Sequence, residues 1–321
     1  MNEVDLIARY FAPLAGPEGL GLGDDAALLT PPPGCDLVLT ADALVAGRHF
    51  FAQDPPESVA AKALGVNLSD LAAKGAEPLG FLLTLALPPD WTEGWLDDFS
   101  KGLGTAAKAS GIALFGGDTV STPGALTLSI TALGAVAHGR MIRRAGARVG
   151  DLLYVSGTIG DAALGLIQRR AQVEGRAAPG WSDDFLVERY WRPRPRLALI
   201  PALNRCASAA MDVSDGLIGD ARALARASGA AVELRLGHVP LSPAAGAALS
   251  ADPTLFDAVL TGGDDYEILC AVAPDHAVGF EESAEALGVA VARIGRIAER
   301  EAILGSDGAP VIFGRDRFSH F

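Results

Sequence analysis

Aspartate stands beside glycine at the edge of apolar runs in several places along this chain. The stretch "LGLGDDAALL" (20–29) places Asp24 and Asp25 side by side between glycines and an apolar run. A single pair of this kind suits a turn, because Gly and Asp tolerate turn geometry and Asp can bond its own backbone. Similar stretches are "LFGGDTV" (114–120), "MDVSDGLIGD" (211–220) and "LTGGDDYEIL" (260–269), with single aspartates in "LTAD" (39–42) and "NLSDLA" (67–72). This repetition favours a shared purpose over separate turns.

These aspartates form a set of candidate metal ligands. The set comprises Asp24, Asp25, Asp42, Asp70, Asp118, Asp212, Asp215, Asp264 and Asp265. If several converge, two carboxylates about 4 Å apart repel each other by about 4 kcal/mol at an intermediate dielectric, and a cation must offset that repulsion. Mg²⁺ takes oxygen ligands and shares its shell between carboxylates and nucleotide phosphates, whereas zinc favours Cys and His clusters that the chain lacks. The pattern therefore predicts a magnesium site that also receives phosphate groups.

The segment 57–75, "ESVAAKALGVNLSDLAAKG", has helical spacing and carries one polar face. Asn67, Asp70 and Lys74 are three and four residues apart, so they share that face. The face could be a solvated stripe with an ion pair between Asp70 and Lys74, or it could look into the metal site. The second interpretation also accounts for the other aspartates at strand ends.

Two familiar phosphate-binding patterns are not supported. "GLGDDA" (21–26) formally fits G-x-G-x-x-A, but its two carboxylates would repel the pyrophosphate of a dinucleotide. The dipeptide Gly-Lys, which the Walker motif requires, occurs nowhere in the chain, and there is no protein-kinase catalytic loop. A nucleotide would have to be held through metal ions and glycine-rich turns instead.

Composition limits the kind of protein. The 321 residues are 50% hydrophobic and 20% charged, which suits two domains with large cores. The net charge of -13 argues against a nucleic-acid partner, because phosphate backbones need a basic surface. We expect Cys35, Cys206 and Cys270, which are far apart, to be small core residues of a reduced protein. No signal peptide or membrane-spanning run is evident, so a cytoplasmic protein without membrane contact is expected.

The secondary-structure elements that position the aspartates are predicted to be of the mixed α/β class. Short apolar runs bounded by Gly or Pro predict strands, and segments with helical spacing that end in Gly predict helices. The expected strands of the first half are 37–42, 80–87, 112–115 and 125–137, with helices at 57–75 and 93–111. The basic, Gly-punctuated segment "GRMIRRAGARVGD" (139–151) separates this half from a second one in which strands and helices alternate again. We therefore predict domains at 1–138 and 139–321.

In these residues the sequence resembles the thiamine-monophosphate kinases of the aminoimidazole ribonucleotide synthetase-like superfamily. The resemblance runs from "LIARYF" (6–11) to the terminal "HF" (320–321) and follows the motifs in order. They are "GDDAALL", "TADALVAGRHF", "KALGVNLSDLAAKGAEP", "GGDT", "RAGARVGD", "SGTIGD", "DVSDGL" and "GGDDYE". The resemblance implies two α/β domains of that type and a homodimer joined through the N-terminal sheets. It also implies Mg²⁺-dependent transfer of the γ-phosphoryl of ATP to thiamine monophosphate, the last step in making thiamine diphosphate.

The same resemblance implies roles for particular residues. ATP would contact Gly117, Asp118, Arg144 and Ser214, and thiamine monophosphate would meet His49 and Asp264. The metal ligands would be Asp25, Thr40, Asp42, Asp70, Asp118, Asp212 and Asp215, with Asp24 beside them. The family often has Glu where Asp264 stands, and Arg315, with Phe318 nearby, falls where an aromatic residue usually flanks the substrate ring. No covalent nucleophile or general base is implied.

Other functions remain open from the residues alone. A purine-pathway cyclo-ligase of the same superfamily shares the acidic motifs, although "AGRHF" and "GGDDYE" favour the kinase. A selenophosphate-type relative would need a reactive Cys near the N-terminus, and Cys35 is the earliest. A non-catalytic cation-binding protein would bind metal without nucleotide.

Overall fold

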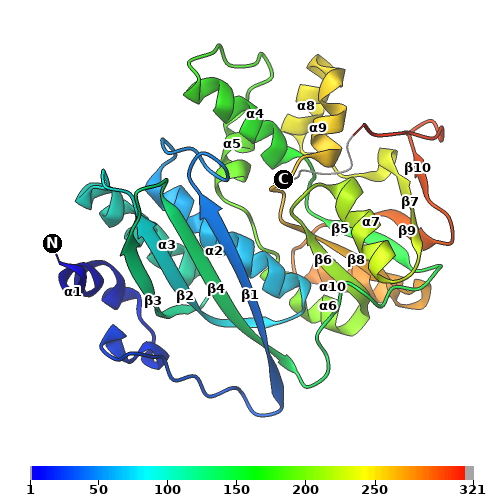
Figure 1. Ribbon diagram of the computed structural model, residues 1–321. Helices are drawn as coiled ribbons and strands as arrows, with labels where there is room; N and C mark the ends of the chain where they lie inside the picture. The colour runs from blue at the N-terminus through cyan, green and yellow to red at the C-terminus, as the bar shows by residue number, and fades with distance from the viewer. Residues whose placement is uncertain (1, 315–321) are drawn as a thin grey trace. The chain divides into compact units, whose positions relative to one another are not determined.

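A computed structural model describes residues 2–314 and divides the chain into two compact units. Unit 1 runs to Leu71 and continues over Ala76–Met141, whereas Ala72–Gly75 group with unit 2, which begins again at Ile142 (Figure 1). The domain boundary predicted from the sequence lies between residues 138 and 139, and the division into units falls three residues later. Among the described residues, no helix is long and apolar enough to cross a membrane.

Unit 1 is built on a mixed sheet. Within the described residues this sheet has four strands in the order β1-β4-β2-β3. Its strands are β1 (Cys35–Val45), β2 (Glu77–Leu87), β3 (Ala113–Ser121) and β4 (Thr127–Ala137). The β1–β4 and β4–β2 pairs are antiparallel, and β2 runs parallel to β3. The prediction that the third strand ends at residue 115 is wrong, because β3 continues through Gly116, Gly117 and Asp118.

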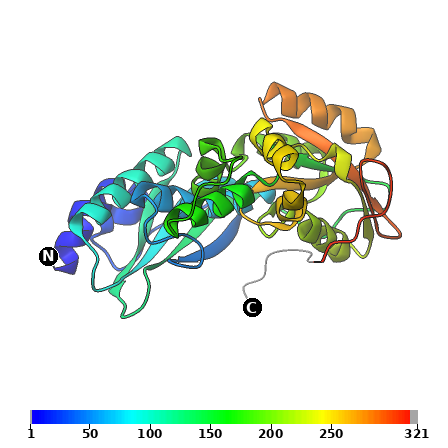
Figure 2. The ribbon, with the colours of Figure 1, turned by 90° about the horizontal axis from the view of Figure 1, so that it is seen from above.

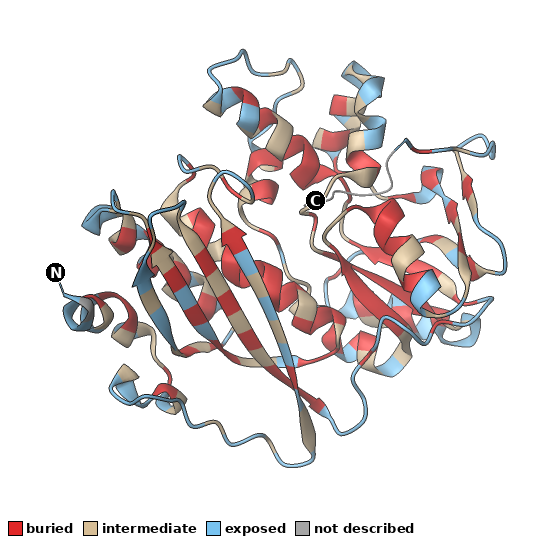
Figure 3. Ribbon diagram, in the orientation of Figure 1, coloured by how far each residue is buried: buried red, intermediate tan, exposed pale blue. Residues whose placement is uncertain are grey.

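Two helices cover one face of this sheet, and the other face is more open. The helices are α2 (Pro56–Ala73) and α3 (Glu93–Ala109). They follow a short N-terminal α1 (Glu3–Leu6), a π-helix at Ile7–Phe11 and 3₁₀-helices at Ala12–Leu14 and Pro17–Leu22. Side chains alternate along the strands, so that Leu83, Leu85 and Ile130 are buried while Leu39 and Leu82 are exposed. Figure 3 shows this alternation as bands across β1 and β2.

Unit 2 contains a larger sheet. Within residues 142–314 its strand order is β10-β7-β9-β5-β8-β6, antiparallel except for the β10–β7 pair. The strands are β5 (Leu152–Ser156), β6 (Ala207–Val213), β7 (Ala231–Arg235), β8 (Glu267–Val272), β9 (Val291–Ala298) and β10 (Ala302–Leu304). Every residue of β8 is buried, because both faces of the sheet are covered at that strand.

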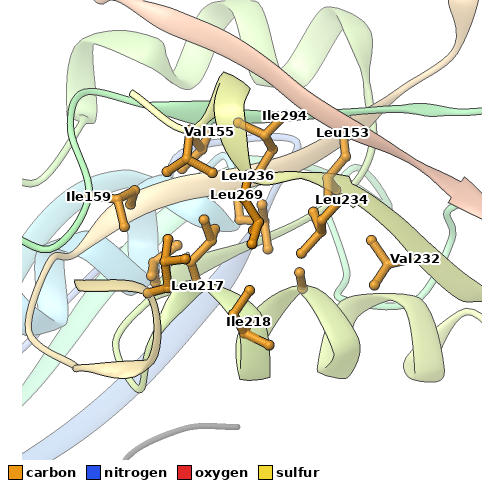
Figure 4. Close-up of a cluster of buried hydrophobic side chains, with 14 of the residues drawn as sticks. Leu153, Val155, Ile159, Leu217, Ile218, Val232, Leu234, Leu236, Leu269 and Ile294 are labelled. Carbon is orange, nitrogen blue, oxygen red and sulfur yellow. The ribbon is translucent and has the colours of Figure 1, made fainter. Parts of the chain in front are cut away.

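Helices pack on both faces of the unit 2 sheet. They are α4 (Asp161–Val173), α5 (Asp184–Trp191), α6 (Ile200–Cys206), α7 (Leu217–Ala227), α8 (Pro243–Ala251), α9 (Phe256–Thr261) and α10 (Ala277–Ala286). One core contains Leu217, Ile218 and Leu269 (Figure 4). The other contains Cys270 and Phe280, and Figure 2 shows α10, in orange, along that face. The expected mixed α/β class is therefore confirmed, but Cys35 and Cys206 are only partly buried.

A glycine in α3 lies against the backbone of α2 and fixes how closely these helices pack. A Cβ atom on Gly102 would lie 2.4 Å from Cα of Glu57, whereas a Cβ atom on Gly94 of the same helix would meet nothing within 4 Å. Gly102→Ala therefore forces two backbones apart, and overpacking of this kind costs about 1–3 kcal/mol.

We expect Gly102→Ala to lower the melting temperature of the protein by several degrees. Gly94→Ala, the matched control, should leave it unchanged or slightly raised, because Ala favours helix over Gly. Thermal unfolding followed by circular dichroism compares the two variants. Equal melting temperatures for both would show that α2 and α3 can separate without cost.

Candidate active site

The polar face of α2 meets the inward face of β1 and brings together several predicted metal ligands. Thr40 Oγ1 donates a hydrogen bond to Asp70 Oδ2, and the Asp42 backbone N–H donates to Asn67 Oδ1 at 3.2 Å. Thr40 and Asp42 are two residues apart on the strand, and Asn67 and Asp70 are three apart on the helix, so both periodicities point these side chains at each other. The interpretation of this helix face as part of a site, rather than a solvated stripe, matches these contacts.

One acid in this cluster, Asp42, has a perturbed pKa. Burial, with a smaller contribution from the nearby carboxylate of Asp70, raises the pKa of Asp42 to about 6. A cation between the two carboxylates would remove this repulsion, because it favours the charged form of both. The donor atoms present here are all oxygens, which fits a hard ion such as Mg²⁺.

A second group of predicted residues lines a cavity of about 820 Å³ on the outward face of the same unit. Asp24, Asp25, Gly117 and Asp118 border it, together with outward side chains of β2 such as Thr84. Asp24 also acts as a turn residue, because its Oδ1 accepts a hydrogen bond from the Asp25 backbone N–H at 2.7 Å. The turn interpretation of this doublet therefore agrees with the structure, and its role as a metal ligand stays a prediction.

The glycine before Asp118 explains how the strand carries this carboxylate to the cavity. Gly117 has φ 154°, and a Cβ atom there would lie 1.8 Å from the Leu83 carbonyl oxygen. Only glycine permits β3 to approach β2 this closely. Asp118 then stands opposite Thr84 in the parallel register and is exposed.

In unit 2, two motif loops are bonded to each other. The Asp264 backbone N–H donates to the Ser214 carbonyl oxygen at 2.9 Å, and the Tyr266 N–H donates to the Val213 carbonyl oxygen at 2.8 Å. A Cβ atom on Gly263 would lie 2.4 Å from the Ser214 carbonyl oxygen, so glycine allows this contact. The predicted ATP contact Ser214 and the predicted substrate contact Asp264 are therefore neighbours.

The loop after β6 has a carboxylate anchor of its own, which the sequence analysis missed. Asp220 Oδ2 accepts hydrogen bonds from the backbone N–H groups of Ser214 and Asp215, both at 3.1 Å. Burial raises the pKa of Asp220 to about 7, while nearby Arg144 lowers it. Asp220 is the last residue of the stretch "MDVSDGLIGD". It follows Asp215 by about one and a half helical turns, and this spacing is the sequence feature that could have identified it.

His49 lies in the turn that follows β1. Its Nδ1 accepts a hydrogen bond from the Val45 backbone N–H at 3.0 Å, so the ring hydrogen is on Nε2. This bond fixes the ring within the turn.

Within each unit, the structure brings predicted residues together in groups. Thr40, Asp42 and Asp70 form one group, and Asp24, Asp25 and Asp118 with Gly117 border the cavity. Ser214, Asp215 and Asp264 lie on the two bonded loops, Asp212 lies at the end of strand β6, and Arg144 is near Asp220. Within residues 2–314, no three carboxylate, Cys or His side chains are arranged to hold a metal ion. Arg315 and Phe318 lie outside the described residues.

Comparisons with known proteins define the class first. The model of the AIR synthase related protein N-terminal domain matches residues 23–136, and that of the C-terminal domain matches residues 148–305. The crystal structure of the Escherichia coli hydrogenase maturation protein HypE shares this fold with a TM-score of 0.76 at 20% identity, over 97% of both chains.

More similar relatives then define the family. Thiamine-monophosphate kinase from Caulobacter vibrioides is 45% identical over 94% of this chain and 86% of its own length. The enzyme of the same name from Escherichia coli K12 is 41% identical over 100% of this chain and 98% of its own length. This chain belongs to the thiamine-monophosphate kinase family.

Solved structures agree with this membership. The Stenotrophomonas maltophilia thiamine-monophosphate kinase superposes with a TM-score of 0.79 and 40% identity, over 90% of this chain and 91% of that one. "AaThiL complexed with AMPPCP and TMP" superposes with a TM-score of 0.78 and 31% identity, over 93% and 91%.

We expect Asp42→Asn to raise the melting temperature of the Mg²⁺-free protein by about 3 °C at pH 8, because about 1 kcal/mol of charge burial is relieved. A raised carboxyl pKa means that the stability held by the protonated form is complete below about pH 4 and is lost as pH rises through about 6. The advantage of the Asn variant should therefore shrink as pH falls through 6. Calorimetry in EDTA from pH 4.5 to 8 measures it.

Asp36→Asn, on the same strand, is the control, because the pKa of Asp36 shifts in the opposite direction from that of Asp42. The Gly139 backbone N–H, and then His138, lower the pKa of Asp36, so its removal should give no gain at pH 8. A lower melting temperature for Asp42→Asn at pH 8 would contradict the repulsion argument.

Proposed function

We propose that this protein is an enzyme that transfers the γ-phosphoryl group of ATP to thiamine monophosphate and releases thiamine diphosphate and ADP. The observation that carries the proposal is the pair of bonded loops that makes Ser214 and Asp264 neighbours. The relatives named thiamine-monophosphate kinase, and one relative bound to AMPPCP and TMP, support the choice of substrates. A cytoplasmic location is part of this proposal, because ATP is the donor.

The chemistry needs alignment more than proton transfer. The acceptor is a phosphate oxygen that is already anionic near neutral pH, so catalysis consists of holding two phosphates in line and neutralising their charge. His49 fits a positioning role, because the hydrogen bond from the Val45 backbone N–H to its Nδ1 fixes the ring in the turn after β1. Arg144 adds a positive charge beside the loop that carries Ser214 and Asp215.

The predicted ligands fit magnesium ions in their chemistry. Asp25, Thr40, Asp42, Asp70, Asp118, Asp212 and Asp215, with Asp24 beside them, would hold Mg²⁺ through oxygen atoms only. The ions would neutralise the charge that the two phosphates bring to an acidic chain. The raised pKa of Asp42 supports a cation at this place.

Incubation of the protein with Mg-ATP and thiamine monophosphate tests the proposal, with products resolved by chromatography. Asp118→Asn should lower turnover by about two orders of magnitude or more, because it removes a charge that holds the phosphate-bridging metal. A folded protein that forms no thiamine diphosphate would refute the proposal. Calorimetry with Mg²⁺ and ATP then identifies a cation-binding protein, which would bind metal without nucleotide.

The two sides of the site should separate in kinetics. His49→Ala should raise the KM for thiamine monophosphate by about tenfold, which is about one contact of 1.4 kcal/mol, and leave the KM for ATP nearly unchanged. Arg144→Ala should do the reverse, with some loss of turnover if its charge also meets the transferring phosphoryl. Steady-state titration of each substrate measures both. If His49 only fastens its turn, its variant will melt earlier and both KM values will move together.

We also propose a homodimer joined through the outward face of the unit 1 sheet. Leu37, Leu39, Leu82 and Val120 are exposed on its strands, with Leu39 62% exposed. Exposed apolar sheet faces of this kind mark interfaces, and two such sheets can pack face to face. The cavity bordered by Asp24 and Asp118 lies on this face too, so a second copy would cover it.

Leu39→Lys should weaken the dimer by about hundredfold, or about 2.7 kcal/mol, because it buries a charge between the sheets. The fold should survive, because the side chain is exposed within one subunit. Sedimentation velocity at several concentrations measures the association. Val278→Lys on α10, at a side chain 66% exposed, is the control and should leave it unchanged. A wild-type monomer, or a variant that still dimerises, would refute this interface.

A further inference from the structure

A buried cluster of charged side chains in unit 2 is not used by the proposed chemistry. Arg189 on α5 is 2% exposed, and Asp161, Asp265 and Glu267 are fully buried. Glu267 accepts hydrogen bonds from Arg189 Nη2 at 2.9 Å and from Arg196 Nε at 2.6 Å. Residues of "SGTIGD", "WRPRPR" and "GGDDYE" therefore meet around one carboxylate.

This cluster holds the loop that carries Asp264. Arg189 Nη2 also donates to the Asp265 carbonyl oxygen at 3.2 Å, so one nitrogen links the loop backbone to Glu267. The Asp265 side chain reaches the start of α4, where its Oδ2 accepts a hydrogen bond from the Gly160 backbone N–H at 2.8 Å. The loop is thus tied by a side chain and a carbonyl oxygen to two helices of the unit.

The backbone conformation of this loop requires hydrogen bonds of this kind to hold it. Asp264 has φ 74° and Tyr266 has φ 51°, which is the left-handed region that residues with a Cβ disfavour. Such conformations persist only where the surroundings fix them, and they gather at functional sites. Asp265, between these two residues, provides that fixation.

Stability alone does not account for the cluster. Buried ion pairs can often be replaced by apolar residues without loss of stability, because desolvation offsets their attraction. The free-energy cost of burying Asp265, Glu267 and Arg189 is better explained by the loop geometry that these residues impose.

The neighbouring loop does not depend on this cluster in the same way. Asp220 fastens the backbone N–H groups of Ser214 and Asp215 from the start of α7. Each loop therefore has its own buried carboxylate, Asp220 for the ATP side and Asp265 for the substrate side.

We propose that Asp265, bonded to Gly160 and Arg189, is a positioning residue that holds Asp264 in its left-handed conformation toward thiamine monophosphate. The proposal rests on the proposed function for the identity of the substrate, while the loop geometry stands by itself. Asp265 acts through Asp264 and does not touch the substrate.

Asp265→Ala removes the acceptor of the Gly160 N–H and should loosen the loop. The KM for thiamine monophosphate should rise by about tenfold, while the KM for ATP stays within about twofold, because Asp220 still fastens the other loop. In the free protein, exchange of the Asp264 and Tyr266 amide hydrogens should accelerate by about tenfold, because their hydrogen bonds open more often.

Two further variants separate positioning from stability. Val232→Ala shortens a buried side chain of the same core, and at matched stability it should leave the loop amides and the ratio of the two KM values unchanged. Asp265→Asn should restore values near those of the wild type, because burial raises the pKa of Asp265 and Asn keeps the shape and an acceptor oxygen. Arg189→Lys keeps the charge but loses the planar donor, and should raise the KM for thiamine monophosphate about threefold even if Asp265→Ala does not fold.

The outcomes are distinguishable. Selective loss of thiamine monophosphate affinity with faster loop exchange supports the proposal. Unchanged loop exchange in the Asp265 and Arg189 variants, or KM values that move together as expected of general destabilisation, overturns it. If the wild type makes no thiamine diphosphate, the proposed function fails, and the exchange measurement still decides whether Asp265 holds the loop.

Discussion

Repulsion between like charges is the constraint on which this structure depends. The proposed reaction joins two phosphate groups, and the chain that would bind them has a net charge of -13. Burial, and to a smaller extent the nearby carboxylate of Asp70, raise the pKa of Asp42, so a negative charge at this place is costly without a cation. Such an arrangement is costly in an empty site and favourable once cations enter, so the charge pattern itself selects the ligand.

The same residue type serves two opposite purposes. Asp118 is exposed at the cavity, and Asp264 stands at the loop that meets Ser214, so both can present charge to a ligand. Asp220 and Asp265 are buried and accept hydrogen bonds from backbone N–H groups. A doublet such as Asp264–Asp265 combines the two purposes, because neighbouring residues in a tight loop point in different directions. Under the proposed function, Asp264 would bind the substrate and Asp265 would shape the loop.

Much of the fold could be predicted from the sequence, because several strands are apolar runs that begin or end near Gly or Pro. The helix at 57–75 and the strand at 125–137 were predicted within two residues of α2 and β4. The extent of β3 was missed, because glycines normally end strands and here Gly117 allows close approach to β2. In the second half, α5, α6, α8, α9 and α10 were not predicted. Alanine-rich or short segments such as α8 and α9 have little periodicity.

The candidate site was predictable in its chemistry and only partly in its arrangement. Spacing alone placed Asn67 and Asp70 on one helix face, and register then set Thr40 and Asp42 against them. Burial depends on the whole fold, so nothing local distinguished Asp265 from Asp264. The burial of Arg189 could not be predicted from the local sequence either, because the pattern of "DFLVERYW" predicts a surface position for an arginine on an amphipathic helix. It is buried because two carboxylates and a carbonyl group from distant segments meet it there, and local sequence patterns do not record that kind of partnership.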